Sequence, residues 1–194
     1  MLGLKLPTDP RWVNLAEKSL EDILSDHAYC EQKAATSCIS LVQGNPQRYR
    51  LVRELSPIVT EEWGHFRQVL KEMDKRGLTL GRQRKDEYVI EILKFQQKGG
   101  GRIKSLVEKL LTNALIEARS CERFRLLSIH LEEQELKDFY HSFMVSEAGH
   151  YRLFLDLALE YGGEEVDVDT RWQEYLDYEK GVMKRIDPRG DRVH

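Results

Sequence analysis

An internal repeat constrains the fold of this chain more than any other feature. Residues 62–70 and 147–155 share Glu, Gly, His, Arg and Leu at equivalent positions, and an aromatic residue follows each histidine. Each stretch holds a Glu-x-x-His motif, which on a helix places a carboxylate and an imidazole one turn apart on the same face. Two such helices that face one another supply four ligands of a carboxylate-bridged two-metal site. The repeat therefore predicts paired helices around metal ligands.

A glutamate also stands at a similar distance upstream of each motif. Glu31 lies 31 residues before Glu62, and Glu117 lies 30 residues before Glu147. If each half folds as a helical hairpin, one Glu comes from each of two helices and Glu-x-x-His from each of the other two. This is the ligand pattern of di-iron carboxylate proteins with a ferritin-like bundle. The expected metal ligands are Glu31, Glu62, His65, Glu117, Glu147 and His150.

The expected donor set suits iron or manganese, because these ions accept carboxylate oxygens with a few imidazoles, whereas zinc favours a smaller tetrahedral set. Gly64 and Gly149 stand inside the two motifs. Each costs about 1 kcal/mol relative to alanine in a helix, so we expect close packing beside the metals. Small side chains follow both upstream glutamates and leave room for a substrate carbon: Ala34, Ala35, Cys38, Ser120 and Cys121.

Three alternatives concern the metal ligands. Glu122 competes with Glu117 for the same role, although its spacing of 25 residues from Glu147 breaks the symmetry. His27 stands four residues before Glu31 on the same helix face, and is either close to the ligands or an ordinary core histidine. A lone Glu-x-x-His motif usually marks a solvated helix face. The metal interpretation therefore depends on both copies and on the upstream glutamates.

The hydrophobic pattern predicts five helices and no strand. Short turns join the first helix to the second and the third to the fourth, and roughly 25 residues separate the second from the third. Four long helices with one long crossover are typical of the ferritin-like four-helix bundle, built from two antiparallel hairpins. The expected helices run from Asp9-Pro10 to Gly44, from Asn45-Pro46 to Gly77 with a kink or restart at Pro57, over 103–129, over 132–161 and over 169–186.

We expect residues 1–194 to form a single ferritin-like domain. Its parts are the bundle over 9–162, a basic crossover over 77–101 within it, and an additional C-terminal helix over 169–186. The content of 41% hydrophobic and 32% charged residues fits a globular protein rich in amphipathic helices. No signal peptide and no stretch of about 20 apolar residues is present, so we expect a cytoplasmic protein without membrane contact.

The three cysteines, Cys30, Cys38 and Cys121, form no Cys-x-x-Cys motif, and their number is odd. A disulfide framework and a structural zinc site are therefore not expected. All three fall in predicted helices, where a buried cysteine acts as a small hydrophobic side chain.

The crossover is strongly basic, although the net charge of the chain is only −3. Residues 75–104 contain nine Lys or Arg and three Asp or Glu. Tyr88 and Phe95 lie among them, and basic residues beside aromatic rings are the means by which proteins contact phosphates and stack on unpaired bases. Solvation of an ordinary loop is the alternative explanation. The candidate RNA-binding residues are Arg82, Arg84, Lys85, Lys98, Arg102 and Lys104.

With these motifs the chain resembles the bacterial tRNA hydroxylases of the MiaE kind, which act on 2-methylthio-N6-isopentenyladenosine next to the anticodon. The resemblance runs from Asp9-Pro10-Arg11-Trp12 to Arg171-Trp172, and its most specific segments are residues 117–124 and 135–140. It implies a di-iron monooxygenase that hydroxylates the isopentenyl group, with two iron ions as cofactor, dioxygen as co-substrate and the six ligands named above.

The resemblance also implies the partners of the reaction. They are a tRNA anticodon loop that carries the modified adenosine and an external electron donor, a reductase system of the ferredoxin or flavodoxin kind. The chain has no flavin, nicotinamide or iron–sulfur motif of its own. A ferritin-like protein that oxidises iron or scavenges peroxide shares every ligand and is the alternative function. A metal-free helical adaptor is a third.

Overall fold

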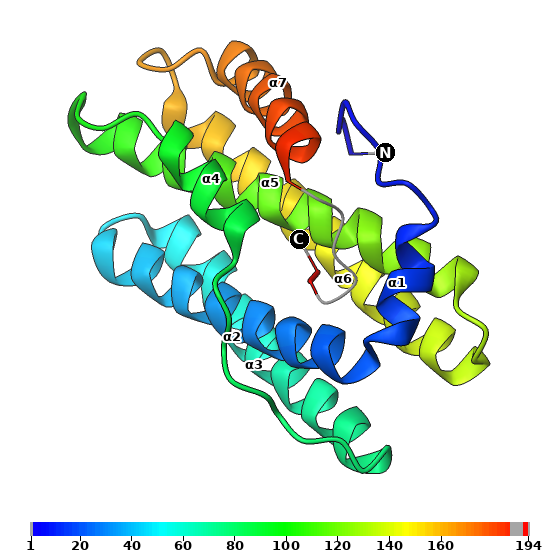
Figure 1. Ribbon diagram of the computed structural model, residues 1–194. Helices are drawn as coiled ribbons and strands as arrows, with labels where there is room; N and C mark the ends of the chain where they lie inside the picture. Colours follow the sequence, from blue (N-terminus) through cyan, green and yellow to red (C-terminus); the bar gives the residue numbers. More distant parts are fainter. Residues whose placement is uncertain (1, 187–191, 194) are drawn as a thin grey trace. The chain divides into compact units, whose positions relative to one another are not determined.

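The computed structural model describes residues 2–186 and 192–193, and these residues form seven α-helices and no β-strand (Figure 1). The prediction of an all-α fold is confirmed. Within this described part of the chain, no helix combines the length and the apolar character needed to cross a membrane. The helices are α1 (Trp12–Lys18), α2 (Leu20–Gly44), α3 (Tyr49–Lys75), α4 (Glu87–Phe95), α5 (Gly101–His130), α6 (Gln134–Gly162) and α7 (Val168–Arg185).

The described residues divide into two compact units. The α2–α3 unit contains residues 15–85 and 192–193, and the α5–α6 unit contains residues 2–14 and 86–186. Helix α1 spans the boundary between them. Each unit is built around one long helical hairpin, as the sequence predicted for the two halves of the chain.

In the α2–α3 unit, two helices of 25 and 27 residues pack against one another and are joined by a short turn at residues 45–48. Their buried residues recur every three or four positions, which is the spacing of a helix face that packs on a neighbour. This face includes apolar side chains and the predicted ligands alike: Leu24, Ala28, Glu31, Ala35 and Cys38 on α2, and Leu55, Ile58, Glu62, His65 and Val69 on α3.

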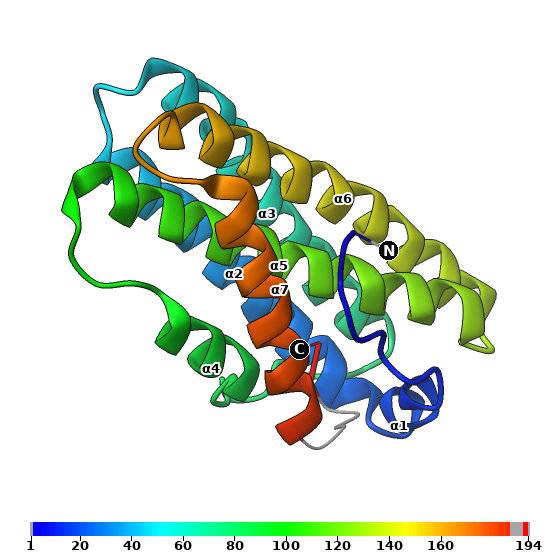
Figure 2. The same cartoon turned by 90° about the horizontal axis from the view of Figure 1, so that it is seen from above.

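The α5–α6 unit contains the second hairpin, with helices of 30 and 29 residues joined at residues 131–133. Helices α4 and α7 contact one another, and both contact α5 (Figure 2). Helix α5 is therefore buried on several sides, which explains why its buried residues do not follow a single stripe.

Two predicted helix boundaries are wrong. The first predicted helix is divided, because α1 ends at Lys18 and α2 begins at Leu20. The second begins at Tyr49 rather than at Asn45-Pro46. Pro57 does not restart α3, which continues through it. Pro57 is exposed, so water can hydrogen-bond to the backbone carbonyl that the proline leaves without its helical donor.

The crossover consists of two differently held segments. Residues 78–85 lie alongside α2. There the Tyr29 hydroxyl donates to the Gly81 carbonyl (2.9 Å), and the Gly81 N–H donates to Ser25 Oγ (3.0 Å). The next segment forms α4, whose first turn is capped by Asp86 accepting from the Val89 N–H (3.0 Å). Gly99, Gly100 and Gly101 then adopt positive φ angles of 79 to 94° before α5. Such angles favour glycine and explain the run of three.

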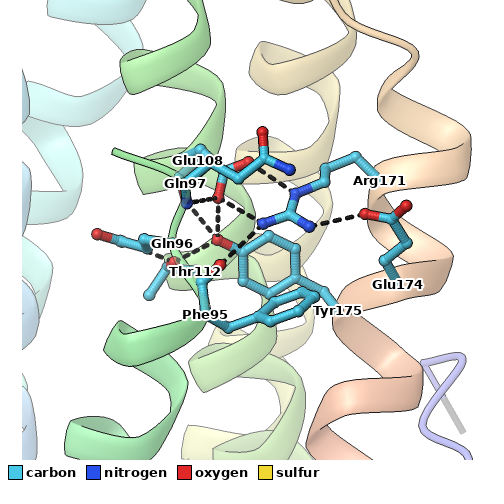
Figure 3. Close-up of polar contacts among 8 residues, drawn as sticks. All are labelled: Phe95, Gln96, Gln97, Glu108, Thr112, Arg171, Glu174 and Tyr175. Atoms are coloured by element: carbon cyan, nitrogen blue, oxygen red, sulfur yellow. Dashed lines mark hydrogen bonds and ion pairs between the residues drawn. The ribbon is translucent and has the colours of Figure 1, made fainter. Parts of the chain in front are cut away.

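A buried polar network fixes the end of α4 to α5 and α7 (Figure 3). The Arg171 guanidinium donates to both carboxylate oxygens of Glu108 (2.7 and 2.9 Å) and to the Phe95 carbonyl (2.9 Å). Glu108 also accepts from the Tyr175 hydroxyl (2.6 Å) and the Gln97 N–H (3.0 Å). The carboxylate is thus neutralised by arginine inside the protein.

A second network holds the N-terminal segment in the same unit. Glu122 accepts from the Thr8 N–H and hydroxyl, each at 2.7 Å, and pairs with Arg119. Arg119 is fully buried, pairs with Glu179 on α7 and donates to the Leu6 carbonyl (2.9 Å). Arg119 therefore connects α5, α7 and residues 6–8.

Candidate metal centre

The α2–α3 unit brings together the three ligands predicted in its own sequence. Glu62 and His65 lie one turn apart on α3, and the short turn between the helices sets Glu31 of α2 opposite them. His65 Nδ1 is 3.2 Å from Glu31 Oε2 and 3.5 Å from Glu62 Oε2. One donor atom of each residue lies within 4.8 Å of the others, and all three side chains are buried. We call these residues the first triad.

The α5–α6 unit contains the equivalent group, the second triad. Glu117 comes from α5, whereas Glu147 and His150 lie one turn apart on α6. Their donor atoms also lie within 4.8 Å of one another, and His150 Nδ1 is 3.4 Å from Glu147 Oε2. All three residues are buried. The internal repeat of the sequence is thus a repeat of local geometry.

The chemistry of both triads fits a metal ion. Two carboxylates and one imidazole within 4.8 Å place like charges side by side in the interior, which is unfavourable unless a cation is shared between them. Glu147 Oε2 is buried and makes no hydrogen bond among the described residues. Carboxylate oxygens with one imidazole suit iron or manganese. Each buried Glu/His group is therefore compatible with half of a di-iron site.

Glu122, the alternative to Glu117, faces a different part of the α5–α6 unit. Residues five apart on a helix are rotated by about 140° from one another. Glu122 accordingly binds Thr8 and Arg119, whereas Glu117 lies with Glu147. The geometry of α5 thus separates a structural carboxylate from a candidate ligand.

His27 is fully buried, and its Nε2 lies 2.8 Å from Glu31 Oε1. The sequence left open whether this histidine is near the ligands, and the structure places it in contact with one of them. The close packing expected at Gly64 and Gly149 is not found. A Cβ atom added at Gly64 or Gly149 meets nothing within 4 Å. These glycines therefore do not serve a close approach beside the ligands.

The three cysteines are buried free thiols, and their burial in helices confirms the prediction made from their positions. Cys121 donates to the Met144 carbonyl (3.3 Å). Burial, together with the carboxylates of Glu147 and Glu122, raises the pKa of this thiol to about 12. Cys121 therefore stays protonated at neutral pH and acts as a small neutral side chain near the second triad.

The predicted RNA-binding residues lie in both units. Arg82, Arg84 and Lys85 belong to the α2–α3 unit, where Arg84 pairs with Asp22 of α2 (3.2 Å). Arg82 and Lys85 are exposed. The other three candidates are exposed members of the α5–α6 unit: Lys98, Arg102 and Lys104.

The proposed role of the crossover aromatics in base stacking is wrong. Tyr88 is 1% exposed, and its hydroxyl lies 3.5 Å from a Glu179 carboxylate oxygen. Phe95 stacks on Tyr178 with ring centroids 4.3 Å apart, and the Arg171 guanidinium lies 4.3 Å from its centroid. Both rings hold α4 in place, so a base cannot stack on them without displacing these contacts.

Two known proteins have sequences similar to this chain over most of its length. The tRNA 2-(methylsulfanyl)-N(6)-isopentenyladenosine(37) hydroxylase of Pseudomonas putida is 38% identical over 161 residues, which cover 83% of this chain and 77% of that protein. The protein of the same name from Salmonella typhimurium is 28% identical over 218 residues, with coverage of 87% and 80%.

A solved structure from Synechococcus, protein 43 with aldehyde deformylating oxygenase activity, matches with a TM-score of 0.90 and 30% identity. The match covers 98% of this chain and 94% of that one, and confirms the ferritin-like fold. Residues 2–194 match the family described as tRNA-(MS[2]IO[6]A)-hydroxylase (MiaE). The chain therefore belongs to the MiaE family.

Proposed function

We propose that this protein hydroxylates the isopentenyl group of 2-methylthio-N6-isopentenyladenosine in tRNA, using dioxygen, external electrons and a di-iron centre. The observation that carries this proposal is the family match over residues 2–194. The names of the relatives from Pseudomonas putida and Salmonella typhimurium support the same reaction. The two buried triads supply residues that suit its cofactor.

The first and second triads together hold two iron ions in this proposal. Their four carboxylates balance the four positive charges of two ferrous ions, and two imidazoles complete a set that leaves positions open. When bound, a di-iron centre would supply the capacity to activate dioxygen and to oxidise an allylic carbon of the isopentenyl group. The residues that bind it are Glu31, Glu62, His65, Glu117, Glu147 and His150.

The protein contributes burial and orientation around the metal ligands. All six are at most 8% exposed, which keeps bulk water from the ligand atoms. Cys38 follows Glu31 on α2, and Cys121 follows Glu117 on α5; both side chains are small and buried. Side chains of this size leave room for an isopentenyl group. The nucleotide beside the anticodon is already unpaired, so its entry requires little unstacking energy.

The tRNA and the electrons come from outside the chain. Exposed Arg82 and Lys85, together with Lys98, Arg102 and Lys104, are the proposed phosphate contacts, and Arg84 joins them if it exchanges Asp22 for phosphate. A reductase system of the ferredoxin or flavodoxin kind delivers the electrons in the cytoplasm, where tRNA is modified.

Mass spectrometry of tRNA nucleosides tests the proposed reaction. Iron-reconstituted protein, a reductant and air are incubated with tRNA that carries 2-methylthio-N6-isopentenyladenosine. We expect a nucleoside heavier by one oxygen atom, with the added oxygen labelled when ¹⁸O₂ replaces air. Unchanged tRNA after incubation with fully iron-loaded protein contradicts the proposal.

The similarity to a protein with aldehyde deformylating oxygenase activity makes oxygen-dependent aldehyde deformylation the second candidate function. The same iron-loaded preparation incubated with an aliphatic aldehyde distinguishes the two, because release of formate without tRNA hydroxylation favours this alternative. Iron storage requires assembly into a hollow shell. A native mass of many subunits, without tRNA hydroxylation, therefore favours the ferritin-like alternative.

A further inference from the structure

We infer that His27 is a positioning residue for Glu31 and that it makes the two metal sites unequal. This inference rests on the proposed di-iron function. His27 and Glu31 lie one turn apart on α2, and both are buried. The imidazole Nε2 lies 2.8 Å from Glu31 Oε1, whereas Glu31 Oε2 lies 3.2 Å from His65 Nδ1. The two oxygens of one carboxylate therefore face different partners.

The contact with His27 restricts how Glu31 presents its oxygens. The last torsion of a glutamate is broad and roughly two-fold, so a free carboxylate samples many orientations. An N–H donated by His27 Nε2 holds Oε1 and leaves Oε2 on the side of His65 and Glu62. A neutral imidazole with its proton on Nε2 is sufficient to donate this hydrogen bond. Hydrogen bonds of this kind orient ligating carboxylates, and their loss commonly costs roughly 10–100-fold in metal affinity.

The second triad has a different residue at the equivalent position. Asn113 lies four residues before Glu117, as His27 lies four before Glu31. Asn113 is half-buried, and its side-chain amide donates to the Lys109 carbonyl in the preceding turn (2.8 Å). The two halves of the repeat thus share their metal ligands but differ at this position, which holds His27 in one half and Asn113 in the other. We expect the metal ion bound by the first triad to be held more tightly than the ion bound by the second.

Anaerobic ferrous iron titrations of the apoprotein test this inference through binding rather than activity. The variants are His27→Leu, His27→Asn, His27→Gln and, as the matched control in the other hairpin, Asn113→Leu. Wild-type protein should bind two ions with different affinities. His27→Leu and His27→Asn should weaken the tighter step roughly 10–100-fold. His27→Gln should restore most of the loss, because its amide N–H reaches about as far as imidazole Nε2. Asn113→Leu should leave both steps unchanged.

Mössbauer spectra of the ⁵⁷Fe-loaded proteins add a readout that a merely structural histidine does not change. We expect two distinct ferrous signals in wild-type protein, and only the signal of the tighter site should change in His27→Asn. The urea midpoint of each apoprotein shows whether it is folded, and His27→Asn and His27→Gln serve if His27→Leu does not fold.

Equal iron affinities of wild type and His27→Asn overturn the inference while leaving the di-iron proposal intact. A loss in His27→Gln as large as in His27→Leu also overturns it, because a hydrogen-bond donor is then not what matters. Failure of folded wild-type apoprotein to bind iron contradicts the proposed function itself.

Discussion

Buried glutamates of the described residues occur in two kinds of surroundings. In the α5–α6 unit, Glu108 is bound by Arg171, and Glu179 by Arg119. In the triads, carboxylates are grouped with histidines, as Glu31 is with His65. Arginine stays charged at any ordinary pH and neutralises its partner permanently. A group of two carboxylates with one imidazole instead has the composition that accepts a metal cation.

The difference shows that burial of a glutamate does not by itself indicate its role. Glu117 and Glu122 are both buried on α5, yet one belongs to the second triad and the other to the Arg119 network. Their partners distinguish them. Glutamates paired with arginine should contribute mainly to folding stability, and the glutamates of the triads mainly to metal binding.

The largest expected effect comes from removing a carboxylate of a triad. Glu62→Ala or Glu147→Ala should abolish both stoichiometric iron binding and tRNA hydroxylation, because each removes a ligand from a set that needs all of its carboxylates. Iron analysis and nucleoside mass spectrometry measure the two effects. Glu54→Ala and Glu160→Ala, at exposed positions of the same helices, are the matched controls. Retained hydroxylation in Glu62→Ala would show that the ligand assignment is wrong.

Removing a buried arginine should have the opposite effect, a loss of folding stability rather than of iron binding. Arg119→Met leaves Glu179 buried without its cation, and breaking a buried ion pair from one side typically costs about 3–5 kcal/mol of unfolding free energy. Urea unfolding of the apoprotein measures the loss. Arg125→Met, at an exposed position of α5, is the control. A change below about 1 kcal/mol in Arg119→Met would remove the proposed distinction between the two kinds of carboxylate.

The stabilisation that Glu108 provides should depend on pH. Burial raises the pKa of Glu108, but hydrogen bonds from Arg171, Tyr175 and the Gln97 N–H outweigh it and hold the pKa below the ordinary value of 4.5. The stabilisation is therefore fully present above pH 4.5 and is lost as the pH falls through the lowered pKa.

Glu108→Gln should lower the unfolding free energy by about 1–3 kcal/mol at neutral pH, because buried Arg171 then keeps only the exposed carboxylate of Glu174 as an ionic partner. The difference from wild type should shrink in acid. Urea unfolding from pH 7 to pH 3 measures both effects, with exposed Glu164→Gln as the control. A constant difference over this range would contradict the lowered pKa.

Exposed charges should contribute little to folding or to iron binding, and so define the baseline of the comparison. Replacement of Arg82, Arg84 and Lys85 by glutamine should weaken tRNA binding, with a salt dependence that is flatter by about one for each lost phosphate contact. Filter binding at several salt concentrations measures the tRNA affinity and its salt dependence. The same test applies to Lys98, Arg102 and Lys104, with exposed Lys184→Gln/Arg185→Gln as the control. Unaltered tRNA affinity in both sets would exclude the proposed surface.

The sequence predicted the long helices and the local geometry of each triad, because both follow from helical periodicity and from short turns. Glu62 and His65 lie on one face for the same reason that their spacing suggested. The pairing of all six ligands around two metals stays a prediction. The ferritin-like fold is confirmed by the match to the Synechococcus structure.

The remaining features depend on contacts between residues far apart in sequence. Arg119 and Glu179 are 60 residues apart, and Glu108 and Arg171 are 63 apart. No local sequence pattern indicates which arginine will pair with a given buried glutamate. The sequence likewise does not indicate that Tyr88 and Phe95 pack against Glu179 and Tyr178 of α7 and are therefore not available to bases. The energetic cost of Gly64 in a helix predicts a packing role, but the structure gives no packing reason for this glycine.

Diffraction from iron-loaded crystals at the iron absorption edge tests the central claim most directly. The account predicts two anomalous peaks, within bonding distance of Glu31, Glu62, His65, Glu117, Glu147 and His150 and of no other side-chain donor. Absence of iron from these residues in crystals whose protein is fully loaded, or peaks bound elsewhere, would contradict it.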